Sequence, residues 1–151
     1  MNRLAKIEDK NIDICTKIYI ETYSKEPWNE EYDFNVVENY INRFILRDSN
    51  HGWILYDDEN AIGIMLGIII PTLGADYFRI EDLCISPNKQ YLGYGSTFIK
   101  MISNELISYN VDSILLNTVE DFPSYKFYLK NKFTEINTSR TLYLDLTDGQ
   151  F

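Results

Sequence analysis

Cysteine and histidine are scarce in this chain, which contains only Cys15, Cys84 and His51 as residues of these two types. The two cysteines lie far apart, in segments that we expect to form a helix and a strand. A disulfide framework or a zinc site is therefore not expected, and two small buried thiols are the simpler interpretation. A single histidine also excludes a multi-histidine metal site, and we assign His51 no role. We predict no bound metal.

Long apolar runs are missing as well. The longest candidate, residues 61–71, is interrupted by Gly63 and Gly67 and is shorter than the roughly 20 residues that a membrane span needs. We interpret it as a buried strand. Charged residues follow Met1 closely without an apolar stretch, so nothing marks the chain for secretion and we expect a cytoplasmic protein. Repeats and Pro/Ser-rich linkers are also lacking, which predicts one domain over residues 1–151.

Positive charge is in deficit, with 14 basic against 23 acidic side chains and a formal net charge of −9. Such a field repels nucleic acids and anionic membrane surfaces and favours cationic ligands. We therefore expect a small cationic molecule as partner, and neither nucleic acid nor membrane. An anionic ligand would need local backbone donors to overcome the repulsion.

The hydrophobic pattern that is present alternates between helical and strand periods. It predicts an α/β fold with a mixed sheet flanked by helices, in the order β-α-α-β-β-β-α-β-α-β-β. Asp33 is the expected N-cap of the second helix, and Pro123 is expected in the first turn of the last helix. The predicted strands are residues 4–7, 53–56, 62–70, 77–85, 113–117, 133–136 and 141–146, and the predicted helices are residues 12–23, 33–45, 95–109 and 123–130.

A glycine loop, residues 85–96, links the fourth predicted strand to the third helix and contains Gly93 and Gly95. Glycine allows close backbone approach, and the free N–H groups and dipole of a helix N-terminus favour an anion, so the loop can hold a pyrophosphate. A dinucleotide loop would need a third glycine where Phe98 stands, and a nucleoside triphosphate loop would need a lysine before Ser96. From the residues alone, a tight turn without a ligand stays open.

The run Gln90-Tyr91-Leu92-Gly93-Tyr94-Gly95 matches the Gln/Arg-x-x-Gly-x-Gly/Ala signature of the GCN5-related N-acetyltransferase (GNAT) family. Residues 123–133 resemble a later helix of the same family, and the predicted element order is similar along almost the whole chain. The resemblance implies acetyl-coenzyme A as co-substrate, held in a V-shaped gap between residues 77–85 and 113–117. The residues that would contact it are Leu83, Cys84, Ile85, Gln90, Tyr91, Leu92, Gly93, Tyr94, Gly95, Ser96, Asp121 and Tyr128.

Three positions depart from the family pattern. Tyr91 and Lys132 stand where many members carry glycine, and Asp121 stands where an asparagine often contacts the cofactor. An acidic side chain at position 121 is expected to weaken that contact. The departures leave the main phosphate loop intact.

The resemblance also implies a chemistry, in which an amine attacks the thioester directly. An alkyl amine with a pKa of about 10.4 is mostly protonated at pH 7, so a base is useful. The family's strand glutamate corresponds to Glu81, beside Asp82, in a run similar to that of polyamine acetyltransferases. The backbone N–H groups of residues 83–85 would hold the acetyl oxygen. Tyr128 matches the tyrosine that protonates the leaving thiolate. From the residues alone, Glu81 and Asp82 are as readily a solvated strand pair.

The acceptor region of this family is the pair of N-terminal helices and their loop, which here contains Trp28 among several acidic side chains. Carboxylates with an aromatic face suit a cationic amine, and the Pro-Trp-Asn-Glu stretch at 27–30 resembles aminoglycoside-type members. A primary amine of polyamine or aminoglycoside type is the preferred acceptor. A protein amine, a non-catalytic acetyl-coenzyme A sensor or interaction module, and a homodimer stay open.

Overall fold

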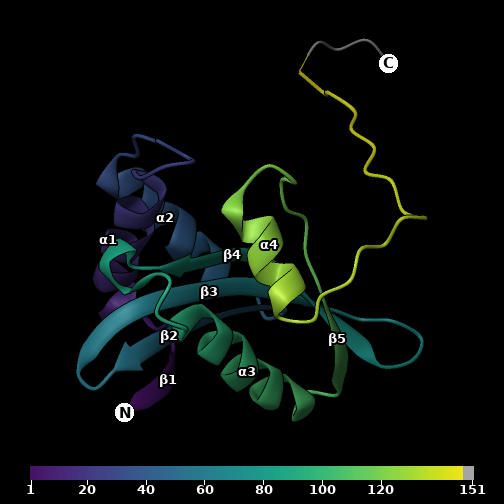
Figure 1. The fold of residues 1–151 in the computed structure, drawn as a ribbon, viewed down its shortest axis with the longest axis horizontal. Coiled ribbons are helices and arrows are strands. Elements are labelled where there is room, and N and C mark those ends of the chain that lie inside the picture. Colours follow the sequence, from purple (N-terminus) through teal and green to yellow (C-terminus); the bar gives the residue numbers. More distant parts are fainter. Residues whose placement is uncertain (148–151) are drawn as a thin grey trace.

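The computed structural model describes residues 1–147, which form a five-stranded sheet with helices on both faces (Figure 1). The mixed α/β architecture predicted from the sequence is confirmed. The elements in chain order are β1 (Asn2–Lys6), the 3-10 turn η1 (Asp9–Asn11), α1 (Ile12–Tyr23), α2 (Phe34–Ile45), β2 (Asn50–Asp57), β3 (Asn60–Ile70), β4 (Asp76–Ile85), the 3-10 turn η2 (Pro87–Lys89), α3 (Tyr94–Ile107), β5 (Val111–Leu115) and α4 (Pro123–Lys130).

The sheet is antiparallel from β1 to β4, and β5 is added in parallel to β4. A parallel pair needs a crossover, and α3 supplies it between β4 and β5. The β4–β5 pairing covers only the first residues of β4, Asp76–Arg79, although β4 continues to Ile85. The two strands therefore part beyond Arg79.

A β-bulge at Glu81 changes which face the second half of β4 presents. Ile80 lies opposite Gly67 on β3 and Asp82 lies opposite Leu66, so Glu81 is the extra, unpaired residue. Ile80 packs in the core on the α3 side, whereas Cys84, four residues later, packs in the core on the α1–α2 side. Without the bulge the two would share one face, because side chains alternate with a period of two.

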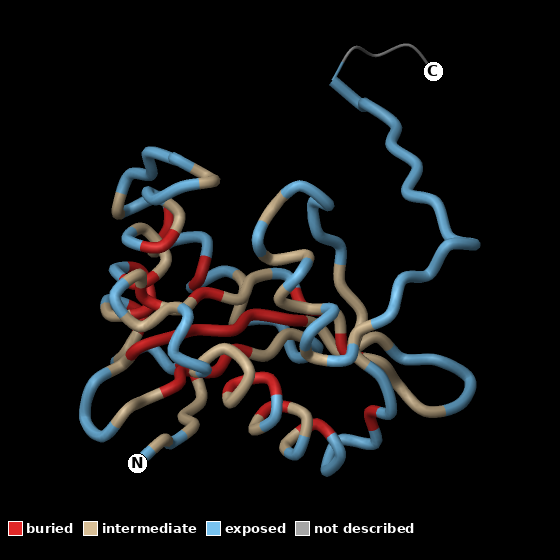
Figure 2. The backbone as a smooth tube through the Cα atoms, in the orientation of Figure 1, coloured by how far each residue is buried: buried red, intermediate tan, exposed pale blue. Residues whose placement is uncertain are grey.

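Each face of the sheet has its own hydrophobic core (Figure 2). On one face, α1 and α2 bury Cys15, Ile18 and Ile41 against β2, β3 and β4. On the other face, α3 buries Phe98 and Ile102, and Phe127 and Tyr128 of α4 pack against the same cluster. The site elements α3 and α4 thus share one core.

The starts of two helices agree with the sequence analysis. The Asp33 carboxylate accepts hydrogen bonds from the N–H groups of Asn35 and Val36, at 2.9 and 3.2 Å, which confirms it as the N-cap of α2. Pro123 occupies the first turn of α4, where its missing N–H costs no helical hydrogen bond. Cys15 and Cys84 are buried free thiols, as expected.

The predicted closing strands, residues 133–136 and 141–146, are wrong for the part of the chain that the structure describes: neither forms a strand between α4 and residue 147. A turn closes at Ile136–Ser139, and all residues from 141 to 147 are exposed and run away from the body (Figure 1). A strand also needs a neighbouring strand to pair with, and within residues 1–147 neither segment has one.

Within residues 1–147, no helix combines the length and the apolar character that crossing a membrane would need.

Candidate active site

The parting of β4 and β5 leaves backbone groups of β4 without a strand partner. The Ser86 N–H donates to the carbonyl oxygen of Ile62 on β3, at 2.8 Å. Because successive residues of a strand direct their N–H groups to opposite sides, those of Leu83 and Ile85 point away from β3, towards the gap. The Ile85 carbonyl accepts from the Gln90 side chain at 2.9 Å, which agrees with this direction. The gap therefore offers two N–H donors to a ligand oxygen.

The glycine loop ends where α3 begins, on the same side of the gap. Gly93 is the N-cap of α3 and has a φ of 89°, a left-handed conformation that glycine adopts without strain. The Thr97 N–H donates to the Gly93 carbonyl at 3.0 Å. The N–H groups of Tyr94, Gly95 and Ser96 precede that first helical bond, so they remain for an anion at the positive end of the helix dipole.

The side chains of the loop are used elsewhere or are exposed. The Tyr94 hydroxyl donates to Asp57 at 2.7 Å, and Tyr91 and Leu92 are exposed. A Cβ at Gly95 would lie 2.9 Å from the ring of Phe127 on α4. Glycine at position 95 is therefore needed for close packing of α3 on α4 as well as for any ligand. The loop's contribution to binding is its backbone.

Two of the three departures from the family pattern fall on left-handed backbone. Tyr91 has a φ of 60° and Lys132 a φ of 68°, where side chains other than Gly, Asn or Asp are strained. At the end of α4, the Lys132 N–H donates to the Leu129 carbonyl and the Phe133 N–H donates to the Tyr128 carbonyl, both at 3.1 Å. These two bonds define a Schellman motif with Lys132 at its left-handed position.

Replacing Lys132 with glycine is expected to raise the free energy of unfolding by up to about 1 kcal/mol, because glycine removes the strain of a Cβ at positive φ. Urea unfolding followed by circular dichroism measures the change. Lys130→Gly, two residues earlier and inside α4, is the control and is expected to lower stability by about 1 kcal/mol. A destabilised Lys132→Gly variant would contradict this account of the helix end.

The acidic pair on β4 is divided by the bulge. Asp82 lies on the α1–α2 side, where its carboxylate accepts hydrogen bonds from the hydroxyls of Tyr23 at 3.2 Å and Tyr40 at 2.5 Å. Burial raises the pKa of Asp82, and the hydroxyls of Tyr40, Tyr23 and Tyr19 oppose that shift. A partly desolvated carboxylate next to tyrosine rings has the chemistry to attract a cation.

Aromatic rings enclose Asp82 and reach across to α4. Tyr19 lies 4.6 Å from Tyr23 between ring centroids, and Tyr23 contacts Trp28 at 5.2 Å. Trp28 in turn meets Phe122 edge-on at 6.1 Å. Phe122 is the N-cap of α4, so this contact joins the loop between α1 and α2 to the segment before α4.

Glu81, the sequence candidate for the base, is the bulge residue and is exposed. Its carboxylate accepts a hydrogen bond from the Arg79 guanidinium. The negative charge of Glu81 contributes to raising the pKa of Asp82 and of Tyr40, so the two carboxylates and this tyrosine are neighbours.

Tyr128 lies on α4 between Phe127 and Phe133, with ring centroids 5.2 Å from each. Burial raises the pKa of its hydroxyl well above the usual range, with Cys84 and Asp82 as smaller causes. The hydroxyl is thus held protonated within the electrostatic reach of Asp82. Burial also raises the pKa of the Cys84 thiol, and the backbone N–H of Cys84 points towards β3, so the structure does not place Cys84 as a donor to the gap, unlike Leu83 and Ile85.

The structure therefore brings together most of the predicted site. Leu83 and Ile85, the loop from Gln90 to Ser96, Glu81 and Tyr128 all surround the point where β4 and β5 part. Asp121 is exposed in the loop before α4, next to Phe122. No functional role was predicted for Tyr19, Tyr23 and Tyr40. The spacing of these tyrosines indicated only that each helix has a buried face. Nothing in the hydrophobic pattern showed that the buried faces of α1 and α2 both contact Asp82.

Comparison with known proteins agrees with this geometry. Residues 12–133 match the acetyltransferase (GNAT) family. A possible acetyltransferase from Clostridium difficile 630 superposes with a TM-score of 0.82 at 12% identity, covering 97% of this chain and 99% of that one. The aminoglycoside 6′-N-acetyltransferase AAC(6′)-Ih from Acinetobacter baumannii superposes with a TM-score of 0.72 at 13% identity, covering 96% and 97%.

A third structure, the aminoglycoside acetyltransferase meta-AAC0020 from an uncultured soil metagenomic sample in complex with sisomicin, gives a TM-score of 0.74 at 10% identity and covers 97% of both chains. No curated protein sequence matches this chain significantly. The chain belongs to the GNAT family of acetyltransferases, whose members generally use acetyl-coenzyme A.

Proposed function

We propose that this protein transfers an acetyl group from acetyl-coenzyme A to a primary amine of a small cationic molecule. The observation that carries the proposal is Asp82, a half-buried carboxylate that accepts hydrogen bonds from tyrosine hydroxyls beside the parted strands. An ammonium group on Asp82 would regain there the favourable interactions that it loses with water. The aminoglycoside acetyltransferases among the similar structures act on small amines, which supports the same class of acceptor.

The pyrophosphate of acetyl-coenzyme A fits the loop before α3. The donors at Tyr94, Gly95 and Ser96 are backbone N–H groups at a helix start, and they need no lysine or arginine in a chain of net charge −9. The thioester would then lie between β4 and β5. There the N–H groups of Leu83 and Ile85 would stabilise the negative charge that develops on the carbonyl oxygen during attack.

Proton transfer is assigned to two side chains. Glu81 accepts the proton of the attacking amine, directly or through a water molecule, and its exposure lets the proton leave to solvent. The amine nitrogen forms a bond to the acetyl carbon, the carbon–sulfur bond breaks, and Tyr128 donates a proton to the departing sulfur. A tyrosine hydroxyl with a raised pKa is protonated at neutral pH and is ready for this step.

The contact between Trp28 and Phe122 joins the loop between α1 and α2 to the segment before α4 and bears on the size of the acceptor. A closed rim favours a small molecule over a folded protein surface. The acidic residues Glu30, Glu31 and Asp33 lie in the loop after Trp28 and would attract further positive charges of a polyamine or aminoglycoside.

Thiol release from acetyl-coenzyme A, measured with a panel of amines, tests the function. The panel contains diamines, polyamines, aminoglycosides and peptides with free N-termini. We expect turnover with small amines that carry at least two positive charges. Acetylation of peptides alone would identify a protein acetyltransferase, and tight binding of acetyl-coenzyme A without turnover of any amine would identify a sensor; either result would overturn the proposal.

Replacing Glu81 with glutamine is expected to lower kcat/KM about 30-fold at pH 7, because the amine must then lose its proton without a base. The defect should shrink as the pH rises towards the pKa of the amine. Steady-state rates from pH 6.5 to 9.5 measure it. Glu59→Gln, in the exposed turn between β2 and β3, is the matched control and should leave the rates unchanged. A defect of constant size across this pH range would contradict the role of Glu81 as base.

A further inference from the structure

One acidic side chain holds the glycine loop at both ends. The Asp57 carboxylate, at the end of β2, accepts a hydrogen bond from the Tyr94 hydroxyl at 2.7 Å. The Lys89 ammonium donates to the same carboxylate oxygen at 3.2 Å. Lys89 comes directly before Gln90, and Tyr94 is the first residue of α3. A single carboxylate oxygen therefore ties the loop to the sheet on either side of residues 90–93.

This cluster is partly shielded from solvent. The side chains of Lys89 and Asp57 are 31% and 24% exposed, and the Lys89 ammonium lies 5.5 Å from the centroid of the Tyr94 ring. The hydrogen bonds from Tyr94 and Lys89 lower the pKa of Asp57, so its carboxylate is ionised at neutral pH. Hydrogen bonds to an ionised acceptor are stronger than neutral ones, which makes both ties effective.

The backbone of the loop needs such ties. Tyr91 has a φ of 60° and Gly93 a φ of 89°, so the short segment contains two left-handed residues. A strained conformation persists only where the surrounding structure enforces it. The side chain of Tyr91 is exposed and cannot supply that support by packing. The support includes the Gln90 side chain, which donates to the Ile85 carbonyl at 2.9 Å, and the two bonds to Asp57.

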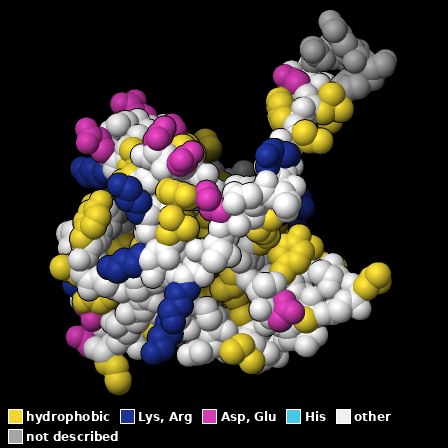
Figure 3. Space-filling view, turned by 45° about the vertical axis from the view of Figure 1, so that its right-hand side comes forward, with side chains coloured by type: hydrophobic (Ala, Val, Ile, Leu, Met, Phe, Trp, Pro, Cys, Tyr) yellow, Lys and Arg dark blue, Asp and Glu magenta, His cyan; other side chains and the backbone are white. Residues whose placement is uncertain are grey.

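By charge alone, an aspartate is unfavourable at this place. Acidic side chains gather at the upper end of the molecule, over the loop between α1 and α2, where a cationic acceptor is expected (Figure 3). Asp57 instead lies beside the start of α3, where the anionic pyrophosphate is proposed to bind, and like charges repel. A benefit of Asp57 to binding must therefore come from geometry.

We propose that Asp57 is a positioning residue for the cofactor, which holds the N–H groups of residues 94–96 in the direction that the pyrophosphate needs by tying Lys89 and Tyr94 to the end of β2. The inference rests on the use of acetyl-coenzyme A proposed above. Donors that are fixed beforehand need not be ordered by the ligand, which increases affinity. Asp57 acts through the loop and takes no part in proton transfer, so kcat should not depend on it.

Calorimetric titration of the full chain with coenzyme A tests this positioning. Asp57→Ala removes both ties and is expected to raise the Kd about 10-fold. The direction of the change separates geometry from charge, because a variant that has lost a negative charge and freed Lys89 would otherwise bind the anion more tightly. Glu59→Ala removes a negative charge from the exposed turn after β2, away from these ties, and should leave the Kd unchanged.

Tyr94→Phe gives a second, milder variant, because it keeps the ring and removes only the hydroxyl. Its Kd should rise about threefold. The double variant Asp57→Ala/Tyr94→Phe should bind no more weakly than Asp57→Ala, since the hydroxyl acts through Asp57. In steady-state assays the KM for acetyl-coenzyme A should rise, while kcat and the KM for the amine stay unchanged. A general loss of folded protein would instead lower kcat and the number of binding sites.

Binding of coenzyme A by folded Asp57→Ala as tight as in the wild type, or tighter, would overturn the positioning role. Should Asp57→Ala fail to fold, an unchanged Kd in Tyr94→Phe would do the same. A wild-type chain that does not bind coenzyme A would contradict the proposed function itself, and the positioning role with it.

Discussion

Replacing Asp82 with asparagine is expected to lower kcat/KM for a small cationic amine by about 100-fold or more, mainly through a higher KM. The carboxylate is half-buried among Tyr19, Tyr23 and Tyr40, so an ammonium bound there has few other charged partners. Loss of one partner of a buried charge pair costs about 2–5 kcal/mol, and a factor of 100 corresponds to about 2.7 kcal/mol. Initial rates over a range of amine concentrations measure the change.

Thermal stability of the Asp82→Asn variant distinguishes a binding role of Asp82 from a structural role. Burial raises the pKa of Asp82, so protonation favours the folded state and the ionised carboxylate lowers stability once the pH exceeds the folded-state pKa. Asparagine removes the charge and can still accept a hydrogen bond from a tyrosine. The Asp82→Asn variant should therefore melt at neutral pH no lower than the wild type.

Two results would contradict the binding role of Asp82. One is a large fall in melting temperature together with an unchanged KM. The other is an equal loss of activity in Asp112→Asn, a matched variant whose side chain is exposed on β5.

The raised pKa of Asp82 also affects how kcat/KM depends on pH. Because the pKa of Asp82 is raised, protonation should abolish ammonium binding at a pH above the usual range of an aspartate. In the wild type, the acid limb of kcat/KM should accordingly lie above that range, and in Asp82→Asn the position of this limb should change, because the titration of Asp82 no longer contributes to it.

Replacing Tyr128 with phenylalanine is expected to lower kcat by about 100-fold, since the thiolate must then leave without a proton donor. The ring packing against Phe127 and Phe133 is kept in this variant, so the KM for acetyl-coenzyme A should change little. Single-turnover rates isolate the chemical step from product release.

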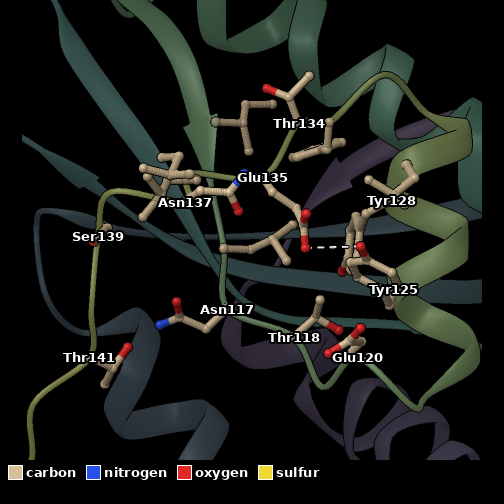
Figure 4. A pocket seen from close by; sticks show the side chains of 16 residues that line it. Asn117, Thr118, Glu120, Tyr125, Tyr128, Thr134, Glu135, Asn137, Ser139 and Thr141 are labelled. Carbon is tan, nitrogen blue, oxygen red and sulfur yellow. Dashed lines mark hydrogen bonds between the residues drawn. The ribbon is translucent and has the colours of Figure 1, made fainter.

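Tyr125→Phe is the matched control for Tyr128. It lies on the same helix, and its hydroxyl donates to Glu135 at 2.9 Å (Figure 4). It should keep nearly full activity. A Tyr128→Phe variant with unchanged kcat would remove the acid from the mechanism and leave the thiolate to depart unaided.

Sequence patterns predicted most of the fold because they rest on local physics. The helix at 12–23 and the helix at 123–130 have the predicted bounds, and the helical and strand periods placed the others within a few residues. The glycine loop was predicted from the two glycines and the helix that follows. The structure adds the reason for Gly95, which is the ring of Phe127 from a distant helix.

The bulge at Glu81 could not be predicted from one sequence. Strict alternation would place Ile80 and Asp82 on one face, and only the register with Gly67 on β3 shows the extra residue. The tyrosines around Asp82 come from two other helices, so their meeting is a tertiary event. Residues 141–146 were predicted as a strand, but an apolar strand pattern does not say which strand edge the segment will join.

A crystal structure with coenzyme A and a diamine bound together tests the central claim most directly. The account predicts the pyrophosphate on the N–H groups of Tyr94 to Ser96, the sulfur between β4 and β5, and an ammonium nitrogen about 3 Å from the Asp82 carboxylate. An amine bound elsewhere, with Asp82 still enclosed by its tyrosines alone, would contradict it.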